Sequence, residues 1–220
     1  LLDQYSFVDT SDTRQMLDLA RFSRARQLNG LAEVFALRAL ETAADDAAAH
    51  EFLGHDRRGG SWYVREGKRW VAYEDLVKLR SSWDAAWEIN TPHYAVKTNL
   101  SLREALDAAM DLELFYREFY DRFGKELELR EVVQSLPTEI HKDAGSFPAL
   151  AGSRTAYFQP DRMTTFVNAE RGYLRNLIFH EASHQLLYAT AVSPEHSARA
   201  KGCLPAWLDE GLASWFENVQ

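Results

Sequence analysis

The sequence predicts an α+β protein in which a mainly helical N-terminal segment precedes a domain of mixed strands and helices. Apolar residues in the first part of the chain recur with helical spacing. Further along, short runs of β-branched and aromatic residues alternate with turn residues, as in strands. We therefore expect three parts: a helical segment at 1–58, a tryptophan-rich segment at 59–90 and a larger domain at 91–220.

The composition is that of an ordinary globular protein. The chain has 220 residues, enough for one large domain or two small ones with a sizeable core. Hydrophobic residues make up 46% and charged residues 26%, and no apolar run approaches the roughly 20 residues that cross a bilayer. A net charge of −8 argues against a general nucleic-acid binder. We expect a soluble protein without a transmembrane segment and without a nucleic-acid partner.

Cys203 is the single cysteine, so neither an intrachain disulfide nor a structural zinc site built from several thiolates can form. The chain starts at Leu1 without a signal-like segment. It ends at Gln220 inside a helical pattern, and we expect the domain to be truncated there.

The N-terminal segment predicts three helices. Residues 10–12 supply N-cap candidates for the first, and Asn29-Gly30 is expected to break its apolar stripe. The second helix is expected at 31–42, and a short third at 45–53 ends at Gly54. The string LARFSRARQLNGLAEVFALRALETAADDAAAHEFLG loosely resembles a tetratricopeptide repeat and part of the next. A plain helical hairpin explains the pattern equally well, and either could contact a protein partner.

The segment 59–90 is rich in tryptophan. SWYVREGKRWVAYE predicts a hairpin that turns at residues 66–67, and 75–87 is predicted to be helical. Such an aromatic group can bind a sugar or a peptide, but it more commonly forms a small core, which we favour here. The four tryptophans are Trp62, Trp70, Trp83 and Trp87.

The third part begins with a predicted strand at 93–98 and a long helix from Ser101 to Gly124. Glu104 stands three residues after Ser101, the spacing of a capping box. Strand-like runs follow at 132–136 and 139–141, with Pro137 between them.

Two more strands and two helices complete the prediction. The runs 155–158 and 163–168 predict a hairpin, and 171–191 predicts a helix. After a polar loop, Pro205 begins a last helix.

The motif HEASH places His180, Glu181 and His184 within little more than one helical turn. Side chains at i and i+4 share one face of a helix, so both imidazoles can reach one metal ion. Glu181 lies to the flank, where it can take a proton from a water molecule. This is the H-E-x-x-H arrangement of zinc hydrolases, in which zinc lowers the pKa of its bound water to about 7 and polarises the scissile carbonyl.

A catalytic zinc ion takes three protein ligands and leaves one position open. The downstream string LPAWLDEGLASWFE offers Glu210 as the third ligand. Glu217 competes for that role, and Glu210 has the alternative of a simple surface position. Gly211 suggests a close approach to the HEASH helix, because glycine is unfavourable inside a helix.

FHEASHQLLY and PAWLDEGLASWFE resemble the gluzincin metallopeptidases, which include thermolysin and the aminopeptidase N type. The string W-L-x-E-G-x-A of that group is matched by Trp207, Leu208, Glu210, Gly211 and Ala213. From His93 to Glu217 the chain looks most like an uncharacterised, peptidase-like gluzincin family with helical repeats upstream. The resemblance implies Zn²⁺ held by His180, His184 and Glu210, Glu181 as general base, and a zincin-like domain whose twisted sheet has an edge strand beside the HExxH helix. It also points to an extracytoplasmic location.

Two departures from this group concern the surroundings of the metal. Thermolysin-type enzymes have an aspartate four residues after the glutamate ligand, where this chain has Ser214. Their oxyanion-stabilising tyrosine or histidine follows further downstream. In this chain the candidates for that role, or for a substrate contact, are Tyr157, Tyr173 and Tyr188.

The sequence therefore predicts a gluzincin-type metallopeptidase acting on a peptide or protein substrate, bound by strand addition along 155–158 or 163–168. Two alternatives stay open: a non-catalytic zincin-fold binding protein, and a metal hydrolase with a non-peptide substrate. Surface or structural roles are expected for the other histidines, which are His50, His55, His93, His141 and His196.

Overall fold

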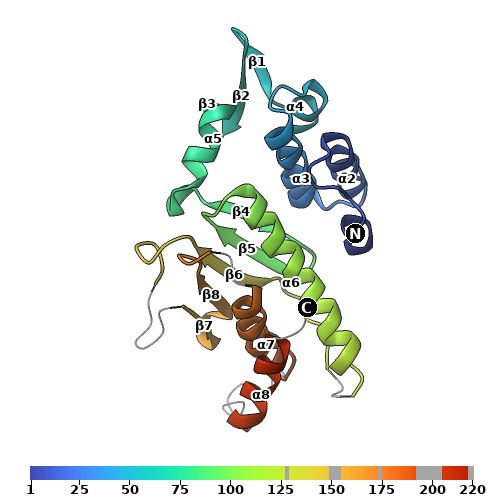
Figure 1. Cartoon of the computed structure of the whole chain (residues 1–220), viewed down its shortest axis with the longest axis vertical. Coiled ribbons are helices and arrows are strands. Elements are labelled where there is room, and N and C mark those ends of the chain that lie inside the picture. The colour runs from blue at the N-terminus through green and yellow to red at the C-terminus, as the bar shows by residue number, and fades with distance from the viewer. Residues whose placement is uncertain (127–128, 149–154, 173–174, 192–204, 218–220) are drawn as a thin grey trace.

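The computed structural model describes residues 1–126, 129–148, 155–172, 175–191 and 205–217, and it confirms the predicted α+β class. The described strands form a three-stranded sheet, β1-β2-β3, and a five-stranded sheet in the order β4-β5-β6-β8-β7. Figure 1 shows the N-terminal helices and the small sheet at one end of the molecule and α7 and α8 at the other. No helix of the described residues is long and apolar enough to span a bilayer.

The N-terminal segment is helical as predicted, apart from a short strand at its end. The carboxylate of Asp12 accepts hydrogen bonds from the backbone N–H groups of Arg14 and Gln15, and so caps the second helix. Gly54 ends the fourth helix in the left-handed conformation, at φ 69°. The helices are α1 (Leu2–Tyr5), α2 (Thr13–Ala25), α3 (Asn29–Thr42) and α4 (Ala47–Leu53).

The prediction that Asn29-Gly30 breaks the helical pattern is wrong, because both residues belong to the first turn of α3. The chain turns before them, where Gln27 adopts φ 63°. Gly30 packs against the backbone of Asn90, with an ideal Cβ position 3.5 Å from the carbonyl oxygen. An alanine at this position would make ordinary van der Waals contacts, so the approach of α3 to the edge of the larger sheet does not depend on glycine.

The small sheet contains the predicted hairpin, and Glu66 pairs with Arg69 across its turn. A third strand that the sequence did not predict, β1, pairs with β2. The helix predicted at 75–87 is wrong in its second half, because α5 ends at Arg80 and a strand begins at Trp87. The elements are β1 (Asp56–Arg58), β2 (Ser61–Glu66), β3 (Arg69–Ala72), α5 (Tyr73–Arg80), the 3-10 helix η1 (Trp83–Ala85) and β4 (Trp87–Asn90).

The tryptophans of this segment pack in different places. Trp62 stacks on His50 at a ring distance of 4.1 Å, and Trp83 stacks on His141 at 3.7 Å. Trp87 is buried in the main core, whereas Trp70 is 40% exposed.

The larger sheet combines three parallel strands, β5, β6 and β8, with an antiparallel strand at each edge. The capping box of Ser101 and Glu104 begins the long helix α6, as predicted. The predicted hairpin of residues 155–168 is also confirmed, as β7 and β8. The elements are β5 (Tyr94–Thr98), α6 (Leu102–Phe123), β6 (Leu136–His141), β7 (Ala156–Gln159), the 3-10 helix η2 (Pro160–Arg162) and β8 (Thr164–Asn168).

One strand, β6, replaces the two runs predicted around Pro137, and the part predicted at 132–135 is not a strand. The N–H of Leu136 bonds to β5 through the carbonyl of His93, so the nitrogen of Pro137 points to the other side. On that side the pairing with β8 starts only at Thr138. Proline therefore costs no ladder hydrogen bond at this position.

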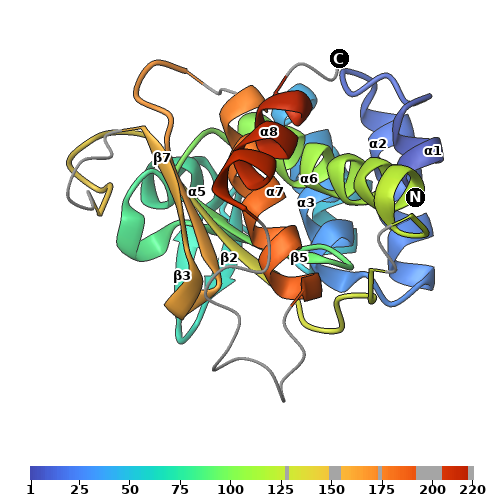
Figure 2. The same cartoon turned by 90° about the horizontal axis from the view of Figure 1, so that it is seen from below.

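Helices α6, α7 and α8 lie on one side of the larger sheet, as Figures 1 and 2 show. The last two helices are α7 (Arg175–Ala191) and α8 (Ala206–Phe216). One hydrophobic cluster includes buried residues of α2, α3, β4, β5, α6, α7 and α8. All three predicted parts contribute to this cluster, while the boundaries between them stay a prediction.

Candidate metal centre

The HEASH motif lies in the middle of α7, as the sequence predicts. One face of this helix is buried against the sheet and α6 through Ile178, Phe179, Ala182 and Leu186. The two histidines lie on another face and keep 18% and 14% of their side-chain surface exposed. The helix is thus fixed by its apolar face, while the imidazoles stay accessible to a ligand.

Helix α8 is held beside α7 by an aromatic cluster. Phe216 is fully buried, and its ring centre lies 4.9 Å from that of Phe115 and 5.5 Å from that of Phe119, both on α6. Phe179 of α7 packs on the same Phe115 ring, at 5.1 Å. This packing sets the distance between the two helices that carry the polar site.

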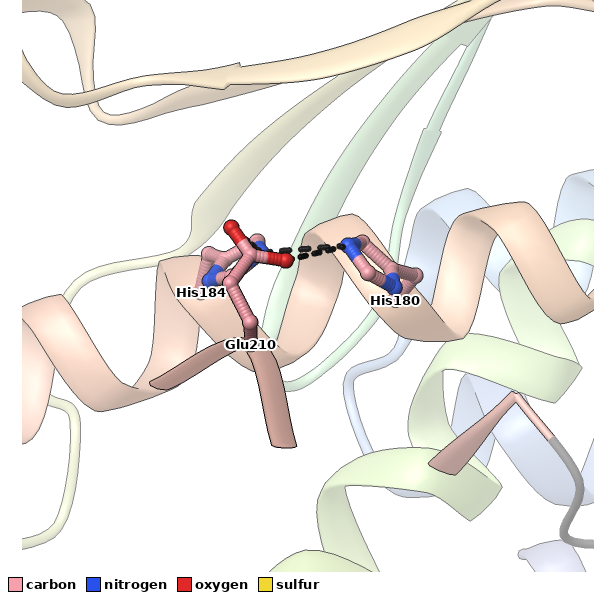
Figure 3. A group of neighbouring side chains, drawn as sticks. All are labelled: His180, His184 and Glu210. Atoms are coloured by element: carbon pink, nitrogen blue, oxygen red, sulfur yellow. Dashed lines mark hydrogen bonds and ion pairs between the residues drawn. The ribbon is translucent and has the colours of Figure 1, made fainter. Parts of the chain in front are cut away.

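His180, His184 and Glu210 come together on the surface of α7 (Figure 3). The two Nε2 atoms are 3.2 Å apart, and the Glu210 carboxylate lies 3.5 Å from Nε2 of His180 and 3.8 Å from Nε2 of His184. Two ligand atoms on a tetrahedral zinc ion, with bonds of about 2.0–2.1 Å, are about 3.3 Å apart. The ligand atoms of the three side chains, which lie within 4.8 Å of one another, could therefore hold a metal ion such as zinc after small adjustments of the Glu210 carboxylate.

The other nitrogen of each imidazole faces a carboxylate, from Asp209 in α8 or from Glu217 directly after it. Nδ1 of His184 lies 3.0 Å from an oxygen of Asp209, within hydrogen-bond geometry. Nδ1 of His180 lies 2.6 Å from an oxygen of Glu217, an ion-pair contact that lacks hydrogen-bond alignment. The sequence offered Glu217 as a competing ligand candidate. In the structure Glu217 contacts Nδ1 of His180, whereas Glu210 faces Nε2.

Glu181 lies between the motif helix and the edge strand β7. Burial raises the pKa of its carboxyl group above the usual range, and the neighbouring His184 and His180 oppose this rise. The backbone of Phe158 in β7 also opposes the rise in the pKa of Glu181. A carboxyl group whose pKa is raised by burial holds a proton more readily than an exposed carboxyl group does.

The tyrosines predicted to face the metal differ in their positions. Tyr157 alternates with Ala156 and Phe158 of β7, so it faces the side of the sheet away from α7. There its hydroxyl donates to the carbonyl of Pro148 at 2.6 Å. Tyr188 follows His184 by one helical turn, and its ring packs at 5.7 Å from that of Phe158. Tyr173 lies outside the described residues. Tyr188 is thus the better placed of the two described candidates.

Gly211 does not have the role predicted from the sequence. An added Cβ atom would meet nothing within 4 Å, so α8 does not need a glycine to approach α7 at this point. Ser214 is exposed, and the carboxylates that face the histidines are supplied by Asp209 and Glu217 instead. Asp209 was missed in the sequence, although it stands directly before Glu210.

Four of the remaining histidines are described, and His196 is outside the described residues. His93 is held by the buried Glu113, with Nδ1 2.7 Å from the carboxylate. His141 is buried beneath Trp83. His50 and His55 contact each other through their Nδ1 atoms at 2.7 Å, a pairing that their spacing did not suggest.

Comparison with protein-family models gives a match in the last part of the chain. Residues 176–220 fit the model of a family described as a protein of unknown function, DUF1570. Neither the curated proteins nor the solved structures contain a match. All the polar residues of the candidate centre lie in the matched region. In this region the chain is similar to a family without an assigned activity.

Proposed function

We propose that this protein is a zinc-dependent hydrolase of peptide bonds, of the gluzincin type. The observation that carries the proposal is the approach of His180, His184 and Glu210, whose ligand atoms lie within 4.8 Å of one another. The donor set of two imidazoles and one carboxylate is one that catalytic zinc ions use in hydrolases. Glu181, directly beside the first histidine, adds a partly buried carboxyl group.

Each residue has a distinct part in this proposal. His180, His184 and Glu210 would hold the zinc ion, which when bound supplies Lewis acidity to activate water and polarise a carbonyl. Glu181 takes a proton from the attacking water and returns it to the leaving amine. Burial, which raises the pKa of Glu181, supports this exchange, because it helps the carboxyl group to hold the proton between the two steps.

The edge strand β7 supports a peptide as the substrate. It forms the border of the five-stranded sheet, antiparallel to β8, and it packs against α7. An extended peptide can add to such an edge through main-chain hydrogen bonds, next to Glu181. The same arrangement, an antiparallel edge strand beside the motif helix, supports the zincin-like architecture implied by the resemblance.

The test compares zinc-loaded wild-type protein with Glu181→Gln on a broad peptide library, with cleavage followed by mass spectrometry. We expect Glu181→Gln to lower kcat/KM by a factor of about 10²–10⁴ while the zinc content stays at the wild-type level. Glu170→Gln changes an exposed glutamate outside the centre and serves as the matched control.

The outcomes separate the alternatives. Zinc-loaded wild type that cleaves no peptide contradicts the proposal and favours a non-catalytic zinc-binding protein, or a hydrolase of another substrate class. Activity that survives in Glu181→Gln excludes Glu181 as the general base.

A further inference from the structure

We propose that Asp209 and Glu217 are positioning residues that fix the two ligand histidines by their Nδ1 atoms. Asp209 would hold His184 and Glu217 would hold His180, so that both Nε2 lone pairs face the metal position. This inference rests on the proposed function only in requiring that a metal binds there.

The course of α8 past α7 explains how one short helix serves both histidines. Asp209 contacts His184 and Glu217 contacts His180, so the residue numbers rise along α8 as they fall along α7. The two helices therefore pass each other in opposite directions. Residues seven apart in a helix lie on one face about two turns apart, which places Glu210 and Glu217 on the side toward α7.

The two nitrogens of each ring require different partners. A carboxylate only accepts hydrogen bonds, so Asp209 at 3.0 Å from Nδ1 selects the tautomer of His184 that carries its proton on Nδ1. Glu217 lies 2.6 Å from Nδ1 of His180 without hydrogen-bond alignment, so the negative charge of its carboxylate favours a proton on that nitrogen by electrostatic attraction. Each Nε2 is then an unprotonated acceptor, as a metal ligand must be.

That tautomer leaves two acceptors facing each other. The Nε2 atoms are 3.2 Å apart, and in this state neither can donate to the other. The Glu210 carboxylate adds a third acceptor at 3.5 Å from Nε2 of His180. A group of three acceptors at these distances is satisfied by a cation between them, so the carboxylates on the Nδ1 side prepare the centre for the metal.

The first measurement is the zinc dissociation constant, determined by chelator competition for the wild type, Asp209→Ala, Glu217→Ala and both changes together. Loss of a carboxylate behind a ligand histidine typically weakens metal binding about 10- to 100-fold, and we expect this for each single change. Asp209→Asn retains an oxygen that accepts from Nδ1, so we expect it to recover most of the affinity, whereas Glu217→Gln removes the charge that acts on His180 and should recover less. Asp121→Asn, on an exposed residue of α6, is the control and should leave the affinity unchanged.

The second measurement is the nitrogen NMR spectrum of the histidine rings in metal-free protein, which reports the tautomer directly. We expect His180 and His184 of the wild type to carry the proton on Nδ1. Asp209→Ala should shift the tautomer equilibrium of His184 alone, and Glu217→Ala that of His180 alone. A merely structural role of either carboxylate would not produce this residue-specific change.

The results distinguish this inference from the proposed function. Wild type that binds no zinc overturns both. Zinc binding with unchanged affinity and unchanged tautomers in the alanine variants overturns the positioning role and leaves the metal site intact. If an alanine variant fails to fold, the Asn and Gln variants and the wild-type tautomers decide the question. Wild-type rings protonated on Nε2 would contradict the inference.

Discussion

Two pairs of histidines touch in this protein, and they are built in opposite ways. In the pair of α7, the Nε2 atoms of His180 and His184 face each other at 3.2 Å, and both Nδ1 atoms face carboxylates. In the pair near the small sheet, His50 and His55 meet through Nδ1 at 2.7 Å. There Nε2 of His50 lies 2.8 Å from the carbonyl oxygen of Ala44.

The difference shows that the partner of the second ring nitrogen decides what a histidine pair can do. The Ala44 carbonyl requires the proton of His50 on Nε2, so Nδ1 of His50 is free to accept from Nδ1–H of His55. That pair is internally satisfied, and it lies against Trp62 and Tyr73. In the proposed centre, the protons of the pair of α7 lie on the outer Nδ1 atoms, which leaves two facing acceptors that a cation would complete.

Removing one ring from each pair tests this comparison with the largest expected effect. We expect His180→Ala or His184→Ala to weaken zinc binding at least about 100-fold, because a ligand and half of the helical pair are lost. His55→Ala removes a ring from the other pair and should leave the zinc affinity unchanged. Chelator competition with each purified variant measures both.

The comparison of the two pairs would be contradicted if His55→Ala lowered the zinc affinity as much as the substitutions in α7 do. Circular dichroism of each variant establishes that the fold is intact before the affinities are compared.

A smaller effect is expected in the pH dependence of stability. Burial, together with the neighbouring His50, lowers the pKa of His55 from 6.5 to about 4. Because the folded-state pKa lies below the unfolded-state value, folding favours the neutral ring. The contribution to stability is complete above about pH 6.5 and is lost as the pH falls toward 4.

Denaturant unfolding of the wild type and His55→Gln at several pH values between 7 and 4 measures this loss. Relative to the variant, the wild type should lose on the order of 1–2 kcal/mol, since solvent around a half-buried ring reduces the full effect. A constant difference between the two proteins across this range would show that the pair does not depend on neutral rings.

The sequence predicted elements whose signals are local. The capping box of Ser101 and Glu104, the end of a helix at Gly54 and the hairpin of β7 and β8 were all confirmed. It failed at β4, where only Trp87 and Ile89 alternate inward and the run is too short to show a strand period against a preceding helix. That strand is stabilised by its pairing with β5, which is a tertiary effect.

At the candidate centre, too, the local spacing could be predicted and the contacts between helices could not. The spacing of His180 and His184 along one helix was enough to bring their rings together, and this could be predicted. The sequence could not predict which nitrogen of His180 each of Glu210 and Glu217 contacts. Residues seven apart share a helix face, and only the crossing of α7 and α8 decides these contacts. The same crossing explains why Asp209 was overlooked.

The most direct test of the metal centre is X-ray absorption at the zinc edge of zinc-loaded, full-length protein, together with its zinc stoichiometry. The account predicts one zinc ion per chain, with a first shell of nitrogen and oxygen at about 2.0–2.1 Å and the scattering pattern of two imidazoles. Protein that binds no zinc would contradict it, and so would a first shell in which the sulfur of Cys203 lies about 2.3 Å from the zinc ion.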